Sequence, residues 1–358
     1  MQELTLIVKL TNQCNLDCVY CFDKQERQKE KTFLTEKQIM VAAEKVLLNA
    51  DQINWIWHGG EPGVYGFEKI VDLTNKIRQL SNRYYSSINF SLQTNGSLLT
   101  EEVIKLLNKN NISFGVSYDG INQIKNRNAN IVDSAFENTS GIISIINPED
   151  NIVENYNFLK QKGIKKIALN MKFPIKQKIT NWKEFINYYF ADKNPLVEKN
   201  ILGYVSKVVD TNDHNTCDWD KFDNILTVRS DGQLCYCDID DKYVFGDFTS
   251  TDKMLLEDYF KTEQYREYLN KKLELKQHCL ETCFLSDICS GCFARIGQQT
   301  EVSDDELDFC EIRRQIYLYI KTLLQTPEKI KNPFVLALIK DYHPNRELEN
   351  YYDLFFND

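Results

Sequence analysis

Three closely spaced cysteines, Cys14, Cys18 and Cys21, constrain the fold of this chain more than any other feature. They follow directly on the apolar run 4–8, whose composition is typical of a β-strand. A structural zinc site uses four protein ligands, whereas a cubane iron–sulfur cluster held by three cysteines keeps one iron open for a small molecule. We therefore expect a reactive cluster at the carboxyl end of the first strand. The alternatives are three reduced, buried cysteines or part of a zinc site.

Apolar runs and amphipathic runs alternate from this loop to about residue 170, which predicts βα units and a parallel sheet. Six strands are expected, at 4–8, 53–57, 88–93, 112–117, 142–146 and 167–170. Helices are expected between them, for example at 35–48 and 67–80. No long amphipathic helix is evident between 117 and 141, so the fourth connection should be short.

The spacing CxxxCxxC, with Tyr20 before the third cysteine, resembles the radical S-adenosylmethionine (SAM) superfamily. This resemblance implies a partial (β/α)6 barrel and a 4Fe-4S cluster whose open iron binds the amino and carboxylate groups of SAM.

After the second strand, His58-Gly59-Gly60-Glu61-Pro62 resembles the GGEP motif of that superfamily. The resemblance implies that Gly59, Gly60 and Glu61 meet the amino group of SAM. Glycines let the backbone approach a ligand closely, and a carboxylate accepts hydrogen bonds from an ammonium. The alternative is an ordinary Gly-Gly turn followed by a surface glutamate.

Asn95 follows the third strand and Ser117 ends the fourth, in stretches that resemble those facing SAM in the peptide- and sulfatase-modifying branch. The resemblance implies that Ser117 contacts the SAM carboxylate. Arg127 either aids that contact or is a solvated surface arginine. Asn-Gly and Asp-Gly pairs are also common turns, which is the alternative interpretation of both stretches.

The other eight cysteines lie between Cys217 and Cys310, and their spacing resembles the SPASM domain, which carries two auxiliary 4Fe-4S clusters. The resemblance implies a β-hairpin and helices, with one cluster held by Cys279, Cys283, Cys289 and Cys310. The other cluster would take Cys217, Cys237 and Cys292. Cys235 either joins this second set, because residues two apart in a strand share a face, or is spare and leaves an iron open. A pair of zinc sites is the alternative for all eight.

Asp238 follows the hairpin cysteine directly and resembles the acid that deprotonates the substrate radical in sulfatase-maturing relatives. A general base must lie within hydrogen-bond reach of the proton that it removes. Because Asp238 lies in the acid-rich run 238–241, a solvated turn carboxylate is the alternative.

Four regions are expected: a barrel at 1–175, a helical bridge at 176–212, the SPASM domain at 213–320 and a C-terminal extension at 321–358. The bridge is rich in aromatic residues near helical spacing, which favours packing over substrate binding. They include Trp182, Phe185, Tyr188 and Tyr189.

A net charge of −9 argues against binding to nucleic acid, and no apolar run is long enough to span a bilayer. The N-terminus lacks the basic start of a signal peptide, so a cytoplasmic protein is expected. Eleven cysteines in such a chain favour metal binding over disulfides, and the clusters favour an oxygen-poor setting.

The resemblance implies a radical SAM/SPASM peptide maturase with three 4Fe-4S clusters. Such an enzyme cleaves SAM reductively, and the 5′-deoxyadenosyl radical abstracts hydrogen from a ribosomal peptide to give a thioether or carbon–carbon cross-link or another oxidised side chain. The expected partners are a peptide or protein substrate and an electron donor such as flavodoxin or ferredoxin. One alternative is an anaerobic sulfatase maturase that forms formylglycine from Cys or Ser, although that branch more often has glutamine at the position of His58. The other is a non-catalytic zinc-binding interaction protein.

Overall fold

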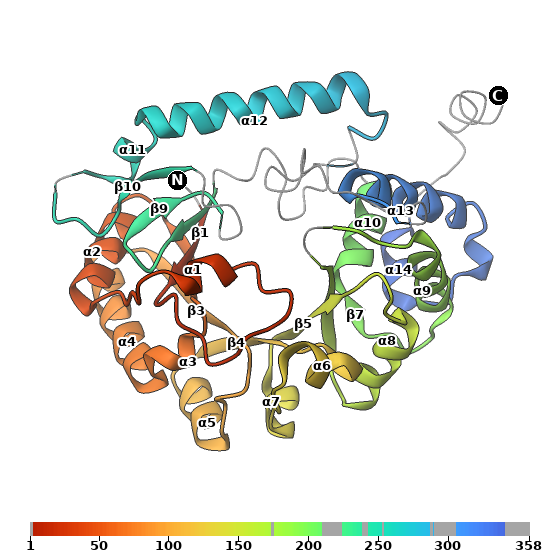
Figure 1. Ribbon diagram of the computed structural model, residues 1–358, viewed down its shortest axis with the longest axis horizontal. Helices are drawn as coiled ribbons and strands as arrows, with labels where there is room; N and C mark the ends of the chain where they lie inside the picture. Colours follow the sequence, from red (N-terminus) through yellow and green to blue (C-terminus); the bar gives the residue numbers. More distant parts are fainter. Residues whose placement is uncertain are drawn as a thin grey trace.

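One curved sheet organises the molecule (Figure 1). The computed structural model describes residues 3–172, 175–209, 224–237, 243–252, 254–286, 289 and 306–340. Within them, ten strands follow the order β10-β9-β8-β1-β2-β3-β4-β5-β6-β7. Neighbouring strands from β1 to β7 are parallel, as is the pair β1 and β8, whereas β9 is antiparallel to both β8 and β10. The expected α/β fold with a mostly parallel sheet and a cysteine-bearing hairpin is confirmed.

The six strands expected from the sequence are all present. The strands are β1 (Glu3–Lys9), β2 (Gln52–His58), β3 (Ser87–Thr94), β4 (Ile112–Ser117), β5 (Gly141–Ile146), β6 (Lys166–Met171), β7 (Val197–Glu198), β8 (Ile225–Val228), β9 (Gln233–Cys235) and β10 (Val244–Asp247).

Most of the longer helices cover the outer face of the sheet (Figure 1), whereas α1 (Lys24–Gln28) lines a cavity on its inner side. The helices of the barrel are α1 (Lys24–Gln28), α2 (Glu36–Leu47), α3 (Pro62–Tyr65), α4 (Phe67–Tyr84), α5 (Glu101–Lys109), η1 (Gly120–Asn122), α6 (Gln123–Arg127), α7 (Asp133–Asn138) and α8 (Ile152–Gln161). Those that follow are α9 (Ile179–Ala191), α10 (Lys199–Val209), α11 (Leu256–Tyr259), α12 (Glu263–Thr282), α13 (Phe309–Leu323), η3 (Pro327–Lys329) and α14 (Pro333–Leu338). None of these described helices combines the length and apolar character needed to cross a membrane.

The alternation of side chains along β1 explains why this sheet has one apolar and one polar face. Leu4, Leu6 and Val8 are fully buried, whereas Thr5 and Lys9 point to the other face and are only partly buried. The apolar face packs against α2 and α4, and neighbouring strands continue it. The inner face therefore collects the polar side chains at the carboxyl ends of the strands, where parallel sheets place their ligands.

The fourth connection is short, as expected. Only η1, α6 and α7 lie between β4 and β5, and none of them exceeds six residues.

The bridge contains a strand that the sequence did not reveal, because β7 has only two residues; it pairs with β6. Trp182, Phe185 and Tyr189 are buried as expected, whereas Tyr188 is 39% exposed. The segment after residue 326 packs on this bridge, where Asn332 Nδ2 donates to the Tyr189 carbonyl at 2.9 Å. The aromatic end of the chain lies outside the described residues.

The hairpin β8–β9 continues the barrel sheet directly, since residues 5–8 of β1 pair with residues 225–228 of β8. Two side-chain contacts hold it to the segment after the first cysteines. Arg229 Nη2 lies 3.0 Å from Glu26 Oε2, and the hydroxyls of Thr32 and Ser230 are 2.6 Å apart. This arrangement brings the second cysteine region next to the first.

Candidate active site

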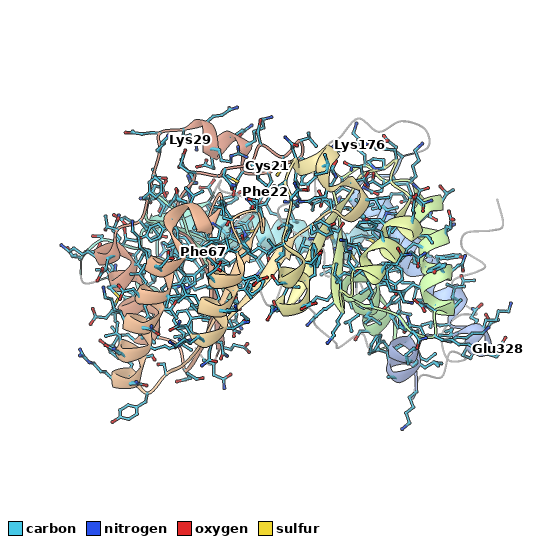
Figure 2. All side chains as sticks on the ribbon, turned by 90° about the horizontal axis from the view of Figure 1, so that it is seen from below. Cys21, Phe22, Lys29, Phe67, Lys176 and Glu328 are labelled. Atoms are coloured by element: carbon cyan, nitrogen blue, oxygen red, sulfur yellow. The ribbon has the colours of Figure 1, made fainter. Side chains whose placement is uncertain are left out.

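The first three cysteines lie in the loop between β1 and α1, on the inner side of the sheet. Figure 2 places Cys21 and Phe22 in the middle of the molecule, between its two groups of helices. The Leu16 amide donates to Cys14 Sγ at 3.4 Å, and Cys18 is buried. Burial raises the pKa of the Cys14 and Cys18 thiols, because it disfavours the thiolate. A positively charged metal centre would reverse this preference, as thiolates are the ligands of iron–sulfur clusters.

By its chemistry the donor set of this loop fits a cluster with an open iron, because three thiols lie within one short loop. In the part of the chain that the structure describes, no three Cys, His, Asp or Glu side chains are grouped so that they could hold a metal ion. The three thiols are free of disulfides.

Asp119, directly after β4, fastens the cysteine loop to the sheet. Its carboxylate is fully buried and accepts hydrogen bonds from Arg127 Nε at 3.1 Å, the Ile145 amide at 3.0 Å and the hydroxyl of Tyr20. The Arg127 guanidinium also lies 5.3 Å from the centre of the Tyr20 ring. Tyr20 is thereby fixed between Cys18 and Cys21. Arg127 is thus buried rather than solvated, and its guanidinium forms an ion pair with Asp119.

Gly59 and Gly60 are required by the close approach of the cysteine loop. A Cβ atom on Gly59 would lie 2.6 Å from the Thr11 carbonyl oxygen, and one on Gly60 would lie 2.3 Å from that of Gln13. Gly59 also has a φ of +148°, a value that other residues rarely adopt. The Gly60 and Glu61 amides donate to the same two carbonyls, each at 2.8 Å. The glycine pair therefore sets the position of the loop that carries the thiols.

Glu61 links the ends of β2 and β3 from a fully buried position. Its carboxylate accepts hydrogen bonds from the Thr94 hydroxyl at 2.7 Å and from the amides of Asn95 at 2.7 Å and Gly63 at 2.9 Å. Burial raises the pKa of Glu61, although these donors oppose the shift. Glu61 is therefore a buried anchor and not the surface glutamate of the alternative interpretation.

Asn95 follows β3 beside this anchor, and Ser117 ends the next strand, β4. Asn95 Nδ2 is 3.0 Å from Asn15 Oδ1 and 3.7 Å from Cys14 Sγ, so it connects β3 with the cysteine loop. Ser117 is half-buried, and its hydroxyl accepts a hydrogen bond from Gln93 Nε2 at 3.0 Å. Their expected contacts with SAM remain predictions.

Cys235 ends β9 of the hairpin, and Cys237 follows it two residues later. The buried Cys235 thiol points to the carbonyls of Thr227, at 3.6 Å, and Cys237, at 3.4 Å. Both cysteines line the same cavity. Cys217, Cys292 and Asp238, which the sequence assigns to this neighbourhood, lie outside the described residues.

Four more cysteines gather where α12 ends and α13 begins. Cys279 interacts electrostatically with Cys283 and Cys289, and Cys310 with Cys289 and Cys279. Burial, the Asp308 carboxylate and the other thiols raise the pKa of Cys310 to about 11. The expected grouping of these four as one ligand set stays a prediction, because among the described residues no three such side chains are grouped closely enough to hold a metal ion.

Arg313 on α13 was not singled out by the sequence, and its surroundings are unusual. Its guanidinium lies 5.1 Å from the ring centre of Phe309 and 5.7 Å from that of Tyr204. Its Nε atom is buried and has no hydrogen-bond partner in the described part of the chain. Burial lowers the pKa of Arg313, but Cys289, Tyr317 and Tyr204 together outweigh it and the net shift is upward. Only the burial of its Nε atom, which the sequence does not reveal, marks this arginine.

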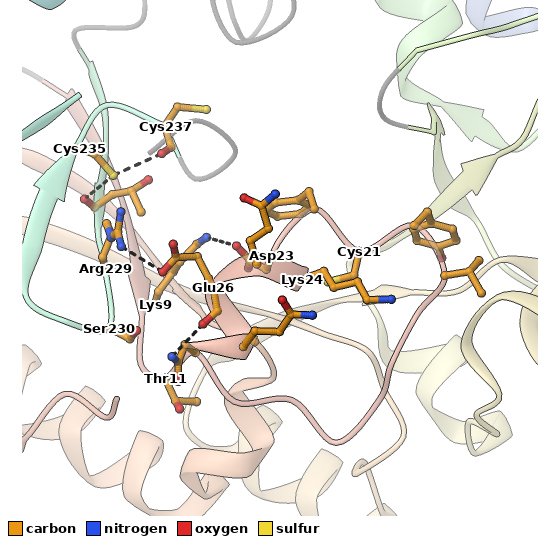
Figure 3. A pocket seen from close by; sticks show the side chains of 18 of the residues that line it. Lys9, Thr11, Cys21, Asp23, Lys24, Glu26, Arg229, Ser230, Cys235 and Cys237 are labelled. Atoms are coloured by element: carbon orange, nitrogen blue, oxygen red, sulfur yellow. Dashed lines mark hydrogen bonds and ion pairs between the residues drawn. The ribbon is translucent and has the colours of Figure 1, made fainter. Parts of the chain in front are cut away.

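A cavity of about 590 Å³ joins the two cysteine regions (Figure 3). The cysteine loop and α1 form one wall, and the hairpin forms the other. Lys9 Nζ lies 2.8 Å from Asp23 Oδ1 on the first wall, and Arg229 pairs with Glu26 across the two. Cys21, Gly60, Cys235 and Cys237 are all part of its lining. Two further lining residues, Thr227 and Lys172, were missed from the sequence because neither belongs to a motif.

Comparison with known proteins gives one family match and several relatives. The model of the radical SAM superfamily matches residues 8–187. The cysteine-type anaerobic sulfatase-maturating enzyme of Clostridium perfringens (strain 13 / Type A) is 25% identical over 373 residues, which cover 89% of this chain and 96% of the relative.

Two solved structures illustrate the similarity of the fold. Native anSMEcpe with bound AdoMet and Cp18Cys peptide has a TM-score of 0.72 at 21% identity, covering 91% of this chain and 99% of that one. Streptococcus suis SuiB bound to S-adenosylmethionine has a TM-score of 0.58 at 14% identity, covering 84% and 75%.

Proposed function

This chain belongs to the radical SAM superfamily, and from this we propose that it oxidises a residue of a peptide or protein substrate. The product is a thioether or carbon–carbon cross-link or another oxidised side chain. When bound, the cluster and SAM supply the reductive cleavage that yields methionine and a 5′-deoxyadenosyl radical, which takes a hydrogen atom from the substrate. The substrate must then lose one proton and one electron to reach a closed-shell product.

The single observation that carries this proposal is the cavity between the cysteine loop and the hairpin. Cys21 and the pair Cys235 and Cys237 line one cavity, so a substrate there lies between two sets of thiols. We assign Cys14, Cys18 and Cys21 to the SAM-binding cluster and the later cysteines to two auxiliary clusters. An auxiliary cluster beside the cavity is suited to accept the electron.

The chain's own residues hold the cysteine loop in place. Asp119 and Arg127 fix Tyr20, and Glu61 fixes the β3 end that carries Asn95. Gly59, Gly60, Glu61, Asn95, Ser117 and Arg127 are proposed to surround SAM, some of them through the residues that they position. Asp238 is proposed as the base that takes the proton.

A second candidate is the conversion of Cys or Ser in a sulfatase to formylglycine. Its support is the similarity to the Clostridium perfringens maturase, which extends over 96% of that relative. The solved structure of anSMEcpe with AdoMet also holds the Cp18Cys peptide.

The first experiment is anaerobic purification and reconstitution, followed by analysis of iron, sulfide and zinc per chain and of 5′-deoxyadenosine formed from SAM with flavodoxin or dithionite. About twelve irons, as three 4Fe-4S clusters require, together with SAM cleavage would support the proposal. Zinc in place of iron, with SAM intact, would instead support a zinc-binding interaction protein. The variant Cys235→Ser tests whether Cys235 is a ligand of an auxiliary cluster. If Cys235 is spare, the variant keeps the iron content of the wild-type protein.

The reaction is then assigned by mass spectrometry of candidate substrates incubated with the reconstituted enzyme. Sulfatase-derived peptides with Cys or Ser test for an aldehyde, which a hydrazide probe captures. Loss of two hydrogens without an aldehyde indicates a cross-link. Cys14→Ala, which removes a ligand of the SAM-binding cluster, serves as the inactive control.

A further inference from the structure

The charge of the cavity is opposite to that of the chain. The sequence has 43 basic and 52 acidic residues, whereas the cavity is lined by four basic residues and only two acidic ones. Both acids are already engaged, because Asp23 pairs with Lys9 and Glu26 pairs with Arg229. The remaining basic residues are Lys24, which is exposed on α1, and Lys172.

Lys172 is the one of these two lysines that is not exposed to solvent, and its charge is not balanced by a carboxylate of the described residues. It follows the last residue of β6 on the inner face of the sheet and is half-buried. Its backbone amide donates to the Ile146 carbonyl at 2.9 Å, which fixes the start of the side chain. Within the described residues its ammonium group has no carboxylate partner. A partly desolvated ammonium that lines a cavity favours an anionic ligand.

Thr227 supplies an independent sign that a polar ligand binds here. This residue of β8 has no exposed surface, and its hydroxyl has no hydrogen-bond partner in the described part of the chain. It lines the same cavity and lies in register with Ile7 of β1 and Cys235 of β9. A buried hydroxyl without a partner is destabilising, and a bound polar group would relieve this.

We propose that this cavity binds a carboxylate of the substrate, with Lys172 supplying the charge and Thr227 a hydrogen bond. This inference rests on the proposed function and deepens it, because it names the substrate class: peptides in which an acidic group lies beside the modified residue. The carboxylate can come from an Asp or Glu side chain or from the C-terminus of the peptide.

The test uses the reconstituted enzyme with SAM and synthetic peptides of sequence acetyl-Gly-Ser-Glu-Cys-Glu-Ser-Gly-amide. In a second peptide Gln replaces both Glu residues, and a third is the Gln peptide with a free C-terminal carboxylate. Affinity is measured by isothermal titration calorimetry. Of the two acidic peptides, the one that binds more tightly is expected to exceed the neutral peptide in affinity about tenfold, because it gains one charge-assisted contact. Preference for the Glu peptide indicates that the carboxylate comes from a side chain, and preference for the free-acid peptide indicates that it comes from the C-terminus.

The variants decide whether Lys172 is responsible. Lys172→Gln is expected to abolish the preference for the acidic peptide. Thr227→Val is expected to weaken the binding of the acidic peptide and to leave the binding of the neutral peptide unchanged. Lys166→Gln, at the exposed opposite end of β6, is the matched control and should keep the preference. Lys172→Glu should favour a peptide with Lys in place of Glu, an inversion that a purely structural role cannot produce.

Equal affinity for all three peptides, including no binding of any, would overturn the proposal. So would a Lys172→Gln variant that loses affinity for SAM while its peptide preference is unchanged, because the lysine would then serve the SAM carboxylate. Since peptide binding does not require SAM cleavage, a preference without 5′-deoxyadenosine formation would count against the proposed function and not against the carboxylate site.

Discussion

The guanidinium of Arg127 and the carboxylate of Asp119 form a buried ion pair, with Nε 3.1 Å from Oδ2, that holds the cysteine loop through Tyr20. Asp119 is fully buried and Arg127 is 9% exposed, so neither charge is well solvated. Removal of one partner leaves the other charge uncompensated, which is more costly than loss of a surface pair. The pair therefore makes the geometry of the cluster loop depend on the fourth strand.

Arg127→Gln is expected to lower the free energy of unfolding by about 3–5 kcal/mol, because Asp119 would remain buried without its charge partner. Urea denaturation of the reduced protein measures this change. Lys162→Gln breaks the surface pair of Lys162 with Asp133 at 3.3 Å and is the control, with an expected loss of at most about 1 kcal/mol. Equal midpoints for the two variants would contradict this role of Arg127.

Gly60→Ala is expected to displace the cysteine loop, because the new Cβ would lie 2.3 Å from the Gln13 carbonyl oxygen. We expect a loss of about 1–3 kcal/mol in stability and weaker SAM binding, measured by urea denaturation and equilibrium dialysis. Gly203→Ala on α10 is the matched control, since a Cβ there meets no atom within 4 Å. That variant should be more stable by about 0.5–1 kcal/mol, because alanine favours the helix. Similar effects of both substitutions would show that the contact with Gln13 is unimportant.

Much of the fold could be predicted because hydrophobic patterns determine it. The six strands and the short fourth connection follow from the apolar runs and their spacing. Strand β7 could not be predicted, since two residues carry no periodicity and pairing with β6 alone defines it. The parallel pairing of β8 with β1 was also missed, because it joins residues more than 200 positions apart and has no local signal.

Those residues of the candidate site that belong to sequence motifs could be predicted. Those whose importance comes from their position in the folded chain could not. The spacing of Cys14, Cys18 and Cys21 identified the loop that the structure places at the sheet. Thr227 and Lys172 are single polar residues whose significance comes only from the cavity that they line. Sequence patterns also gave Arg127 an even chance of being solvated, whereas its ion pair with Asp119 buries it.

Glu198 predicts a dependence of stability on pH. It is fully buried, and burial raises its pKa to about 7 from an ordinary value of 4.5, although the amides of Leu169 and Ile201 oppose the shift. Between these two values the unfolded chain has released its proton while the folded chain retains it. The unfolded state then binds fewer protons, so stability falls as pH rises from about 4.5 to about 7, by about 3 kcal/mol in total.

Glu198→Gln removes this titration. We expect the free energy of unfolding of the variant, minus that of the wild-type protein, to rise between pH 5 and pH 8 by about the amount that Glu198 contributes. Urea denaturation at several pH values measures the difference. Glu102→Gln on the surface of α5 is the control and should give a difference that does not rise over this range. A flat difference for Glu198→Gln as well would mean that Glu198 is ionised throughout.

Arg313→Gln is expected to lower the midpoint potential of the auxiliary cluster proposed for Cys279, Cys283, Cys289 and Cys310. Reduction adds negative charge to a cluster, and a nearby guanidinium stabilises the reduced form. Arg313 is well placed to do so, because its buried Nε lacks a hydrogen-bond partner in the described residues and Cys289 is among the groups that raise its pKa.

A redox titration followed by electron paramagnetic resonance measures this potential, and we expect a downward shift of tens of millivolts that leaves the iron content unchanged. Arg83→Gln, on the exposed face of α4, is the matched control because it removes the same charge far from the cysteines of α12 and α13. If both variants kept the wild-type potential, the charge of Arg313 would be balanced by groups other than the cluster. If Arg313→Gln alone shifted it, this arginine would set how readily the cluster accepts the electron that substrate oxidation releases.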